Sequence, residues 1–133
     1  MKRSSLKIEW SDAPDIRKRI HLLVKHAEID WVVSGRLFIY RSINSKTRAY
    51  ARTWGLPSLW QRSLDVTPAY IIEVISEHFD KLPQRQQDEV LLHELAHIPK
   101  NFSGALVPHI RRGKRNFHGM VHDLVDKYLR NFK

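Results

Sequence analysis

The stretch Gln84–Pro99, QRQQDEVLLHELAHIP, has the pattern of one amphipathic helix that lies between two prolines. Pro83 fits the first turn of a helix, where no backbone N–H is needed, and the proline that closes the stretch cannot continue a helix. His93 and His97 are four residues apart, so we expect them on one face, about one turn from each other. Glu94 projects beside them, and residues 93–97 together form an HExxH motif.

The HExxH spacing favours a metal site. Two imidazoles on one helical face can both bind one Zn²⁺, each at about 2.0–2.1 Å. Glu94 would lie near a water on the ion and could accept its proton, because zinc lowers the pKa of such a water towards 7. The alternative is a helix with structural histidines, since a shuffled chain of this composition contains the motif roughly two times in a hundred.

The apolar surroundings of the motif argue against structural histidines. The neighbouring residues are Val90, Leu91, Leu92 and Leu95. Polar groups buried among such residues cost stability unless they are paired or bind something. We therefore interpret the motif as part of a zinc site.

A third metal ligand has to follow the motif. The metzincin extension requires a glycine and then a histidine at fixed steps, and this chain has Lys100 and Ser103 there. No glutamate follows Glu94. Asp123 and Asp126 fall on the polar side of the last predicted helix. Histidine is therefore the expected third ligand.

Three histidines remain as candidates, namely His109, His118 and His122. His118 and His122 lie at the edge of the apolar stripe of the last helix and further out, which is typical of partly solvated side chains. His109 follows Pro108 in a loop that must fold back after Pro99. We therefore prefer His109 as the third ligand and keep His118 as the alternative.

The remaining segments predict an α+β fold. Residues 11–14, SDAP, are typical of a helix start with a capping side chain, and a helical apolar repeat follows them. Strands are expected at Arg36–Ser42, Ala49–Trp54 and Ala69–Ile75, the first two as a hairpin. A last helix is predicted from about Asn116 to Leu129. The expected architecture is a helix, a small, mostly antiparallel sheet of about three strands, the HExxH helix and a C-terminal helix.

Composition narrows the class of protein. A chain of 133 residues suits a single domain, of which residues 1–10 could form a flexible tail. Cysteine is absent, so any metal must be held by His, Asp or Glu. No apolar run approaches eighteen residues, and the basic N-terminus lacks the apolar stretch of a secretory signal. These features indicate a cytoplasmic protein that does not enter the membrane.

Other side chains are candidates for supporting roles at such a site. Tyr128, His118 and Arg111 could each donate a hydrogen bond to an oxyanion. Trp54 and Trp60 flank a Gly-Leu-Pro turn, where they could line a substrate pocket, although packing into a small core is the more frequent role of such aromatics. The predicted strand at residues 69–75 could pair with an extended substrate if it lies at a sheet edge, or it could form the sheet core.

Three segments carry a family resemblance: AYARTWGLPSLWQ, PAYIIEVISEHFDKL and HELAHIPKNFSGALVPH. Over roughly residues 36–115 they resemble a family of small proteins from archaea, bacteria and phages that is assigned as metallopeptidases. The HIPK-FSG-L-PH string is the most distinctive part. The resemblance implies His93, His97 and His109 as zinc ligands and Glu94 as the general base.

The chain is also similar to SprT-like minimal zincins. Those proteins usually place their third histidine directly before a glycine and four residues before a large aromatic. His109 is followed by Ile110 instead, whereas His118-Gly119 fits the first condition but has His122 at the aromatic position. The closer resemblance points to His109.

These patterns predict a zinc-dependent metallopeptidase that acts on a peptide or protein substrate. A formal net charge of +9 motivates a rival, because an excess of basic residues favours anionic partners such as nucleic acid. The rival is a DNA-associated SprT-like protease, or a nucleic-acid-binding protein in which the metal only stabilises the fold.

Overall fold

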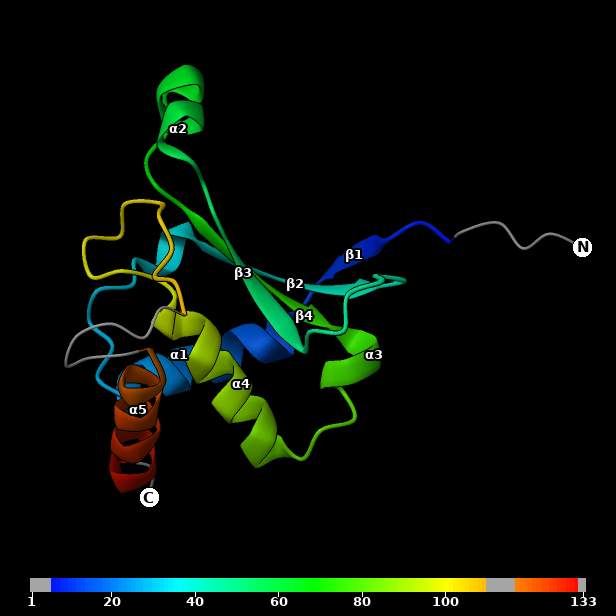
Figure 1. The fold of residues 1–133 in the computed structure, drawn as a ribbon, viewed down its shortest axis with the longest axis vertical. Coiled ribbons are helices and arrows are strands. Elements are labelled where there is room, and N and C mark those ends of the chain that lie inside the picture. Colours follow the sequence, from blue (N-terminus) through cyan, green and yellow to red (C-terminus); the bar gives the residue numbers. More distant parts are fainter. Residues whose placement is uncertain (1–5, 110–116, 132–133) are drawn as a thin grey trace, which may run out of the picture.

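The computed structural model describes residues 6–109 and 117–131, and its centre is a four-stranded sheet (Figure 1). The strands are β1 (Glu9–Asp12), β2 (Leu37–Ile43), β3 (Ala51–Gly55) and β4 (Tyr70–Ile75). Their order across the sheet is β1-β2-β4-β3. β2 and β4 run parallel, whereas β1 pairs with β2 and β3 pairs with β4 in antiparallel fashion. The predicted α+β class with a small, mostly antiparallel sheet is confirmed.

Helices pack mainly against one face of this sheet. They are α1 (Pro14–His26), α2 (Ser58–Leu64), α3 (Ser76–Phe79), α4 (Gln84–Ala96) and α5 (Phe117–Asn131). α1, α4 and α5 pack together beneath the sheet in Figure 1, whereas α2 projects away from the body of the molecule. Among the described residues, no helix combines the length and the apolar character that crossing a membrane requires.

The core lies between the sheet and α1, α4 and α5. Its fully buried side chains include Ile16, Ile20 and Leu23 of α1, Ile72 and Val74 of β4, and Leu91, Leu92 and Leu95 of α4. Burial of this apolar surface is the main force that holds α4 under the sheet. Another side of α4, together with β3, lines a cleft.

The predicted hairpin of the first two strands is wrong, because β4 lies between β2 and β3. β4 is the most apolar strand and is buried on nearly its whole length, a pattern typical of a central strand. The connection between β2 and β3 is long enough to leave room for β4. β4 is therefore not the sheet edge that an extended substrate could use, and this edge belongs to β3.

Two elements were not anticipated. Glu9 and Trp10 lie in β1, so a flexible tail over residues 1–10 does not describe them. Ser11 and Asp12 are also strand residues, and α1 begins after Ala13 without a side-chain cap. The residues after the Gly-Leu-Pro turn, which include Trp60, form α2. Every residue of β1 is exposed and no residue of α2 is buried. Because neither element has a buried face, neither has the repeating apolar pattern from which strands and helices are predicted.

Candidate metal centre

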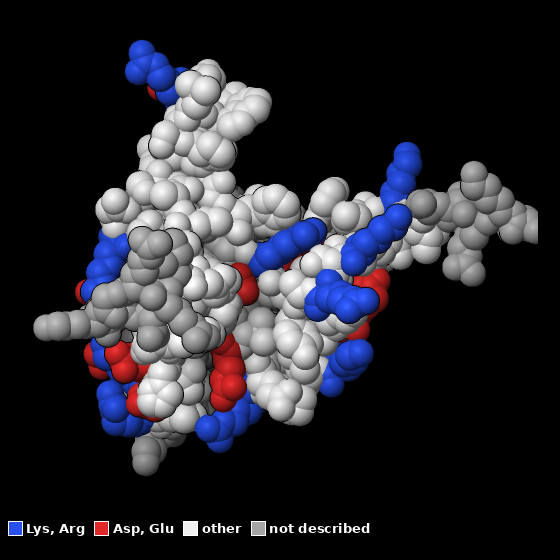
Figure 2. Space-filling view, viewed as in Figure 1, with Lys and Arg blue, Asp and Glu red and all other residues white. Residues whose placement is uncertain are grey.

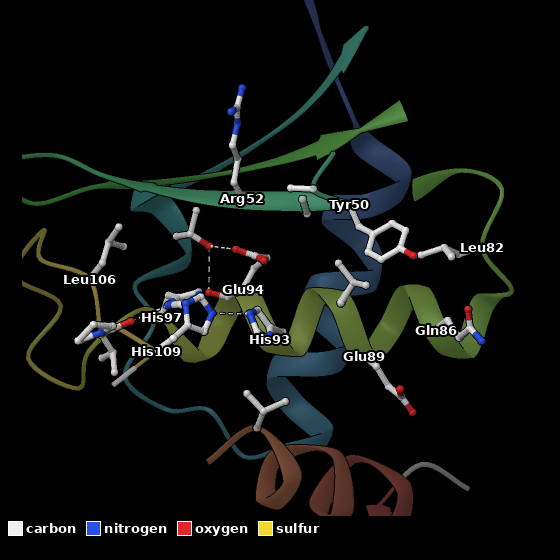
Figure 3. A pocket seen from close by; sticks show the side chains of 17 residues that line it. Tyr50, Arg52, Leu82, Gln86, Glu89, His93, Glu94, His97, Leu106 and His109 are labelled. Carbon is white, nitrogen blue, oxygen red and sulfur yellow. Dashed lines mark hydrogen bonds between the residues drawn. The ribbon is translucent and has the colours of Figure 1, made fainter. Parts of the chain in front are cut away.

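Three imidazoles converge at the C-terminal end of α4 (Figure 3). His93 lies in the last turn of α4, His97 directly follows the helix, and His109 comes from the connection towards α5. The ring centroids of His93 and His97 are 5.1 Å apart, and that of His109 lies 5.0 and 4.4 Å from them. Each residue offers a nitrogen, and these atoms all lie within 4.8 Å of one another.

The chain after α4 is folded back onto the end of that helix. Val107 N donates to the backbone oxygen of His97 at 2.7 Å, and His97 Nδ1 donates to Val107 O at 2.6 Å. Gly104 makes the preceding turn with φ at +99°, where a Cβ would also meet Leu56 O at 2.2 Å. These contacts bring His109, two residues after Val107, over the motif.

The protonation of His93 and His97 suits metal binding. Because His97 Nδ1 carries the hydrogen that Val107 O accepts, its Nε2 keeps a free lone pair. Burial, followed by the neighbouring imidazoles, lowers the pKa of His93 to about 4. Burial lowers the pKa of His97 as well. His93 and His97 are therefore neutral at neutral pH, the form in which histidine binds a metal.

An aromatic ring closes one side of this cluster. Phe117, the first residue of α5, is 2% exposed and stacks on His97 with a centroid distance of 4.3 Å. Its ring also meets those of His93 and His109 edge-on, at 4.8 and 4.7 Å. The imidazoles are thus held by packing, and α5 keeps water from that side.

The cluster fits a divalent transition metal ion. His93 Nε2 and His109 Nε2 lie 3.0 Å apart, and two lone pairs in this position require a proton or a cation between them. Tetrahedral ligands at about 2.0–2.1 Å from zinc are separated by roughly 3.3 Å, close to the spacing seen here. Three imidazoles are moreover a donor set that such ions prefer.

Glu94 faces β3 beside the cluster. Its Oε1 lies 2.8 Å from Thr53 Oγ1, which is also 3.0 Å from the backbone oxygen of Glu94. The residue is 6% exposed, and burial raises its pKa to about 7 although the contact with Thr53 opposes the shift. A carboxyl group with such a pKa can accept and return a proton near neutral pH. Sequence reasoning missed Thr53, since only strand order and register place it there.

The other predicted ligands are not brought to this point. Among the described residues, the second group that could share an ion is His122, Asp123 and Asp126, which lies on the outer side of α5. His122 and Asp126 are 3.4 Å apart there, as in an ordinary surface ion pair. His118 is exposed and belongs to neither group.

Tyr128 and the two tryptophans, which were predicted to support the site, are not directed to the cluster either. Tyr128 donates to Asp88 Oδ2 at 2.8 Å within the helical layer, so its hydroxyl is not directed to the cluster. Trp54 and Trp60 are 49% and 57% exposed, so neither is packed into the core, and neither lines the cleft that holds the three histidines. Arg111 lies outside the described residues.

Comparison with known proteins gives one match. No curated protein and no solved structure matches the chain. The family described as "Putative phage metallopeptidase" matches residues 8–129, which include every strand and α4 with its HExxH motif. This confirms the resemblance seen in the sequence and implies a metal ion, for which the three histidines are suitable ligands. The chain belongs to this phage metallopeptidase family.

Proposed function

We propose that the protein is a zinc-dependent metallopeptidase in which His93, His97 and His109 hold the ion. The convergence of three imidazoles beside one buried glutamate carries the proposal. Zinc, when bound, supplies Lewis-acid chemistry: it makes a water molecule more acidic and polarises the carbonyl of the scissile peptide bond.

Glu94 acts as the general base. Its carboxylate takes a proton from the attacking water and passes that proton to the leaving amine. Burial makes the carboxyl group a stronger base than an exposed glutamate, and Thr53 Oγ1 orients it at 2.8 Å.

The substrate lies extended along β3. Among the described strands, β3 is at the sheet edge and pairs with β4 alone, so its outer backbone groups can accept another strand. Residues 49–53 line the same cleft as the three histidines. An added strand would therefore cross the cleft with its backbone close to the metal centre.

Metal content and proteolysis test this proposal together. We expect about one zinc per chain in the purified protein, loss of stoichiometric zinc in His109→Ala, and retention in the matched variant His118→Ala. Cleavage of an unfolded protein should disappear with a chelator and return when zinc is added. Full zinc content in His109→Ala, or cleavage that survives zinc removal, would contradict the proposal.

A nucleic-acid partner is a second proposal, supported by the open face of the sheet. Trp10 and Trp54 are 60% and 49% exposed on this face, and stacking on such rings is a common way to bind single strands. Lys46 and Arg48 are exposed in the nearby β2–β3 connection. Figure 2 shows several Lys and Arg side chains over the end of the molecule where β1 and the β2–β3 connection lie in Figure 1.

Binding of a labelled single-stranded DNA, followed by fluorescence anisotropy, tests the second proposal. We expect affinity that falls steeply between 50 and 200 mM salt, by about 300-fold if six phosphates are contacted. Trp54→Ala should weaken binding, whereas Trp60→Ala, an exposed tryptophan on α2, should not. Absence of binding at low salt would end this proposal and leave the peptidase proposal intact.

A further inference from the structure

The cleft that holds the metal centre extends well beyond it. Its volume is about 950 Å³. From the three histidines it continues along α4 towards the start of that helix, as Figure 3 shows. The apolar and aromatic walls of this far end are Tyr50, Leu82, Val90 and Val121, and the exposed polar side chain of Gln86 also lines it. Each wall comes from a different element or connection, so the far end is enclosed by several parts of the fold.

These walls are apolar or aromatic. Val90 and Val121 are partly buried and pack against the core, so they form a firm floor on α4 and α5. Tyr50, which directly precedes β3, is 47% exposed and covers the far end from the side of the sheet. In Figure 3 its ring points along the cleft towards Leu82. The half-exposed ring of Tyr50 and the two valines together form an apolar surface that another apolar side chain can bury.

Two charged groups that line the cleft away from the three histidines, Glu89 and Arg52, are directed elsewhere. Glu89 is 45% exposed and pairs with Arg85 at 3.5 Å, and Figure 3 shows it pointing away from Tyr50. Arg52 bonds Glu73 on the opposite face of the sheet, with Nε 2.9 Å from Oε1. Neither group offers a fixed partner to a charged side chain at the far end.

We propose that the far end of the cleft is a subsite for a large apolar or aromatic side chain of the substrate. The inference rests on the proposed function and names the substrate class. Val90 lies three residues before His93, about 5 Å along the helix axis, and strand residues rise about 3.3 Å each. A substrate paired with β3 therefore places a residue within about two positions of the scissile bond over this subsite.

The experiment uses the zinc-loaded full chain and capped Gly/Ser octapeptides that differ in one central residue: Phe, Leu, Ala, Arg or Asp. We expect kcat/KM for the Phe and Leu peptides to exceed that for the Ala peptide by about tenfold or more. Binding to Glu94→Gln, measured by calorimetry, should follow the same order without requiring catalysis. The Arg and Asp peptides should be no better than the Ala peptide.

Two variants test the walls separately. Tyr50→Ala removes the covering ring and Val90→Phe fills the floor, and each should reduce the Phe-to-Ala ratio at least about fivefold. Trp60→Ala, which lies on α2 away from the cleft, is the matched control and should keep the ratio. Two wall variants are used because the floor substitution could disturb the core, whereas Tyr50 is half exposed.

The outcomes distinguish a failure of the proposed subsite from a failure of the proposed peptide hydrolysis. Preference for Phe in binding without any cleavage supports the subsite and overturns hydrolysis. Cleavage that ignores the central residue, favours Arg, or keeps its Phe preference in both Tyr50→Ala and Val90→Phe overturns the subsite and leaves the peptidase standing. Neither cleavage nor binding of any peptide overturns both.

Discussion

Glu94 and Glu73 are both almost excluded from water, at 6% and 1% exposure, but they lie on opposite faces of the sheet. Glu73 accepts hydrogen bonds from Arg52 and Trp54 at Oε1, at 2.9 and 2.8 Å, and from Trp10 at Oε2, at 3.3 Å. Glu94 has Thr53 as its side-chain partner among the described residues.

The different partners give the two carboxyl groups opposite acidities. Burial alone would raise the pKa of Glu73, but the donors from Arg52 and Trp54 outweigh it and the pKa falls below its ordinary value. For Glu94 burial prevails, and the pKa rises to about 7. Burial therefore does not by itself mark a catalytic carboxylate: one that is saturated with donors is structural, whereas one left with a single hydroxyl is suited to move a proton.

Replacing each glutamate by glutamine in one cleavage assay gives the largest difference. We expect Glu94→Gln to lower kcat by about 10²–10⁴-fold, because the general base is lost, while zinc stays bound. Glu73→Gln, measured on the fraction that remains folded, should keep kcat within about threefold of the wild type. Equal losses in the two variants would remove the functional distinction between these residues.

Glu94 should make the metal-free protein less stable as the pH rises. Its folded pKa of about 7 lies above the ordinary 4.5, so the unfolded chain releases this proton first as pH rises. Folding stability is then lost between about pH 4.5 and 7, by up to about 3 kcal/mol. Urea unfolding in a chelator should show Glu94→Gln to be more stable than the wild type at pH 8 and similar to it at pH 4.

Glu73 should show the opposite dependence. Its folded pKa lies below 4.5, so its contribution is fully present above that pH and is lost as pH falls through the lowered value. Glu73→Gln should cost about 2 kcal/mol at pH 7, since it leaves the donors of Arg52 and Trp54 poorly paired. The same urea titrations measure this. A deficit that stays constant down to pH 2 would show that charge is not involved.

Removing one donor from each carboxyl group should give the smallest effects. Trp54→Phe takes one bond from Glu73 and should cost about 1 kcal/mol in urea unfolding without affecting kcat. Thr53→Val takes the bond from Glu94 and should shift the acid limb of the pH–rate profile upward, because this bond lowers the pKa. An unchanged acid limb in Thr53→Val would indicate that another group controls the profile.

The local sequence was sufficient to predict the part of the site that α4 and the residue after it provide. The four-residue spacing of His93 and His97 determines that they share a face, because helical geometry is set by neighbouring residues. The order of helices and strands determined the α+β class for the same reason. We predicted His109 as the third ligand because it follows Pro108 and because of the family resemblance. Its role as a ligand stays a prediction.

Tertiary structure alone decided the rest. The placement of β4 between β2 and β3 depends on which strand buries most apolar surface, and this made β3 the edge over the cleft. The contacts that separate the two glutamates join residues far apart in sequence, 41 positions for Thr53 with Glu94 and 63 for Trp10 with Glu73. Local patterns cannot specify such pairs, because hydrogen-bond register and burial are set only when distant segments pack together.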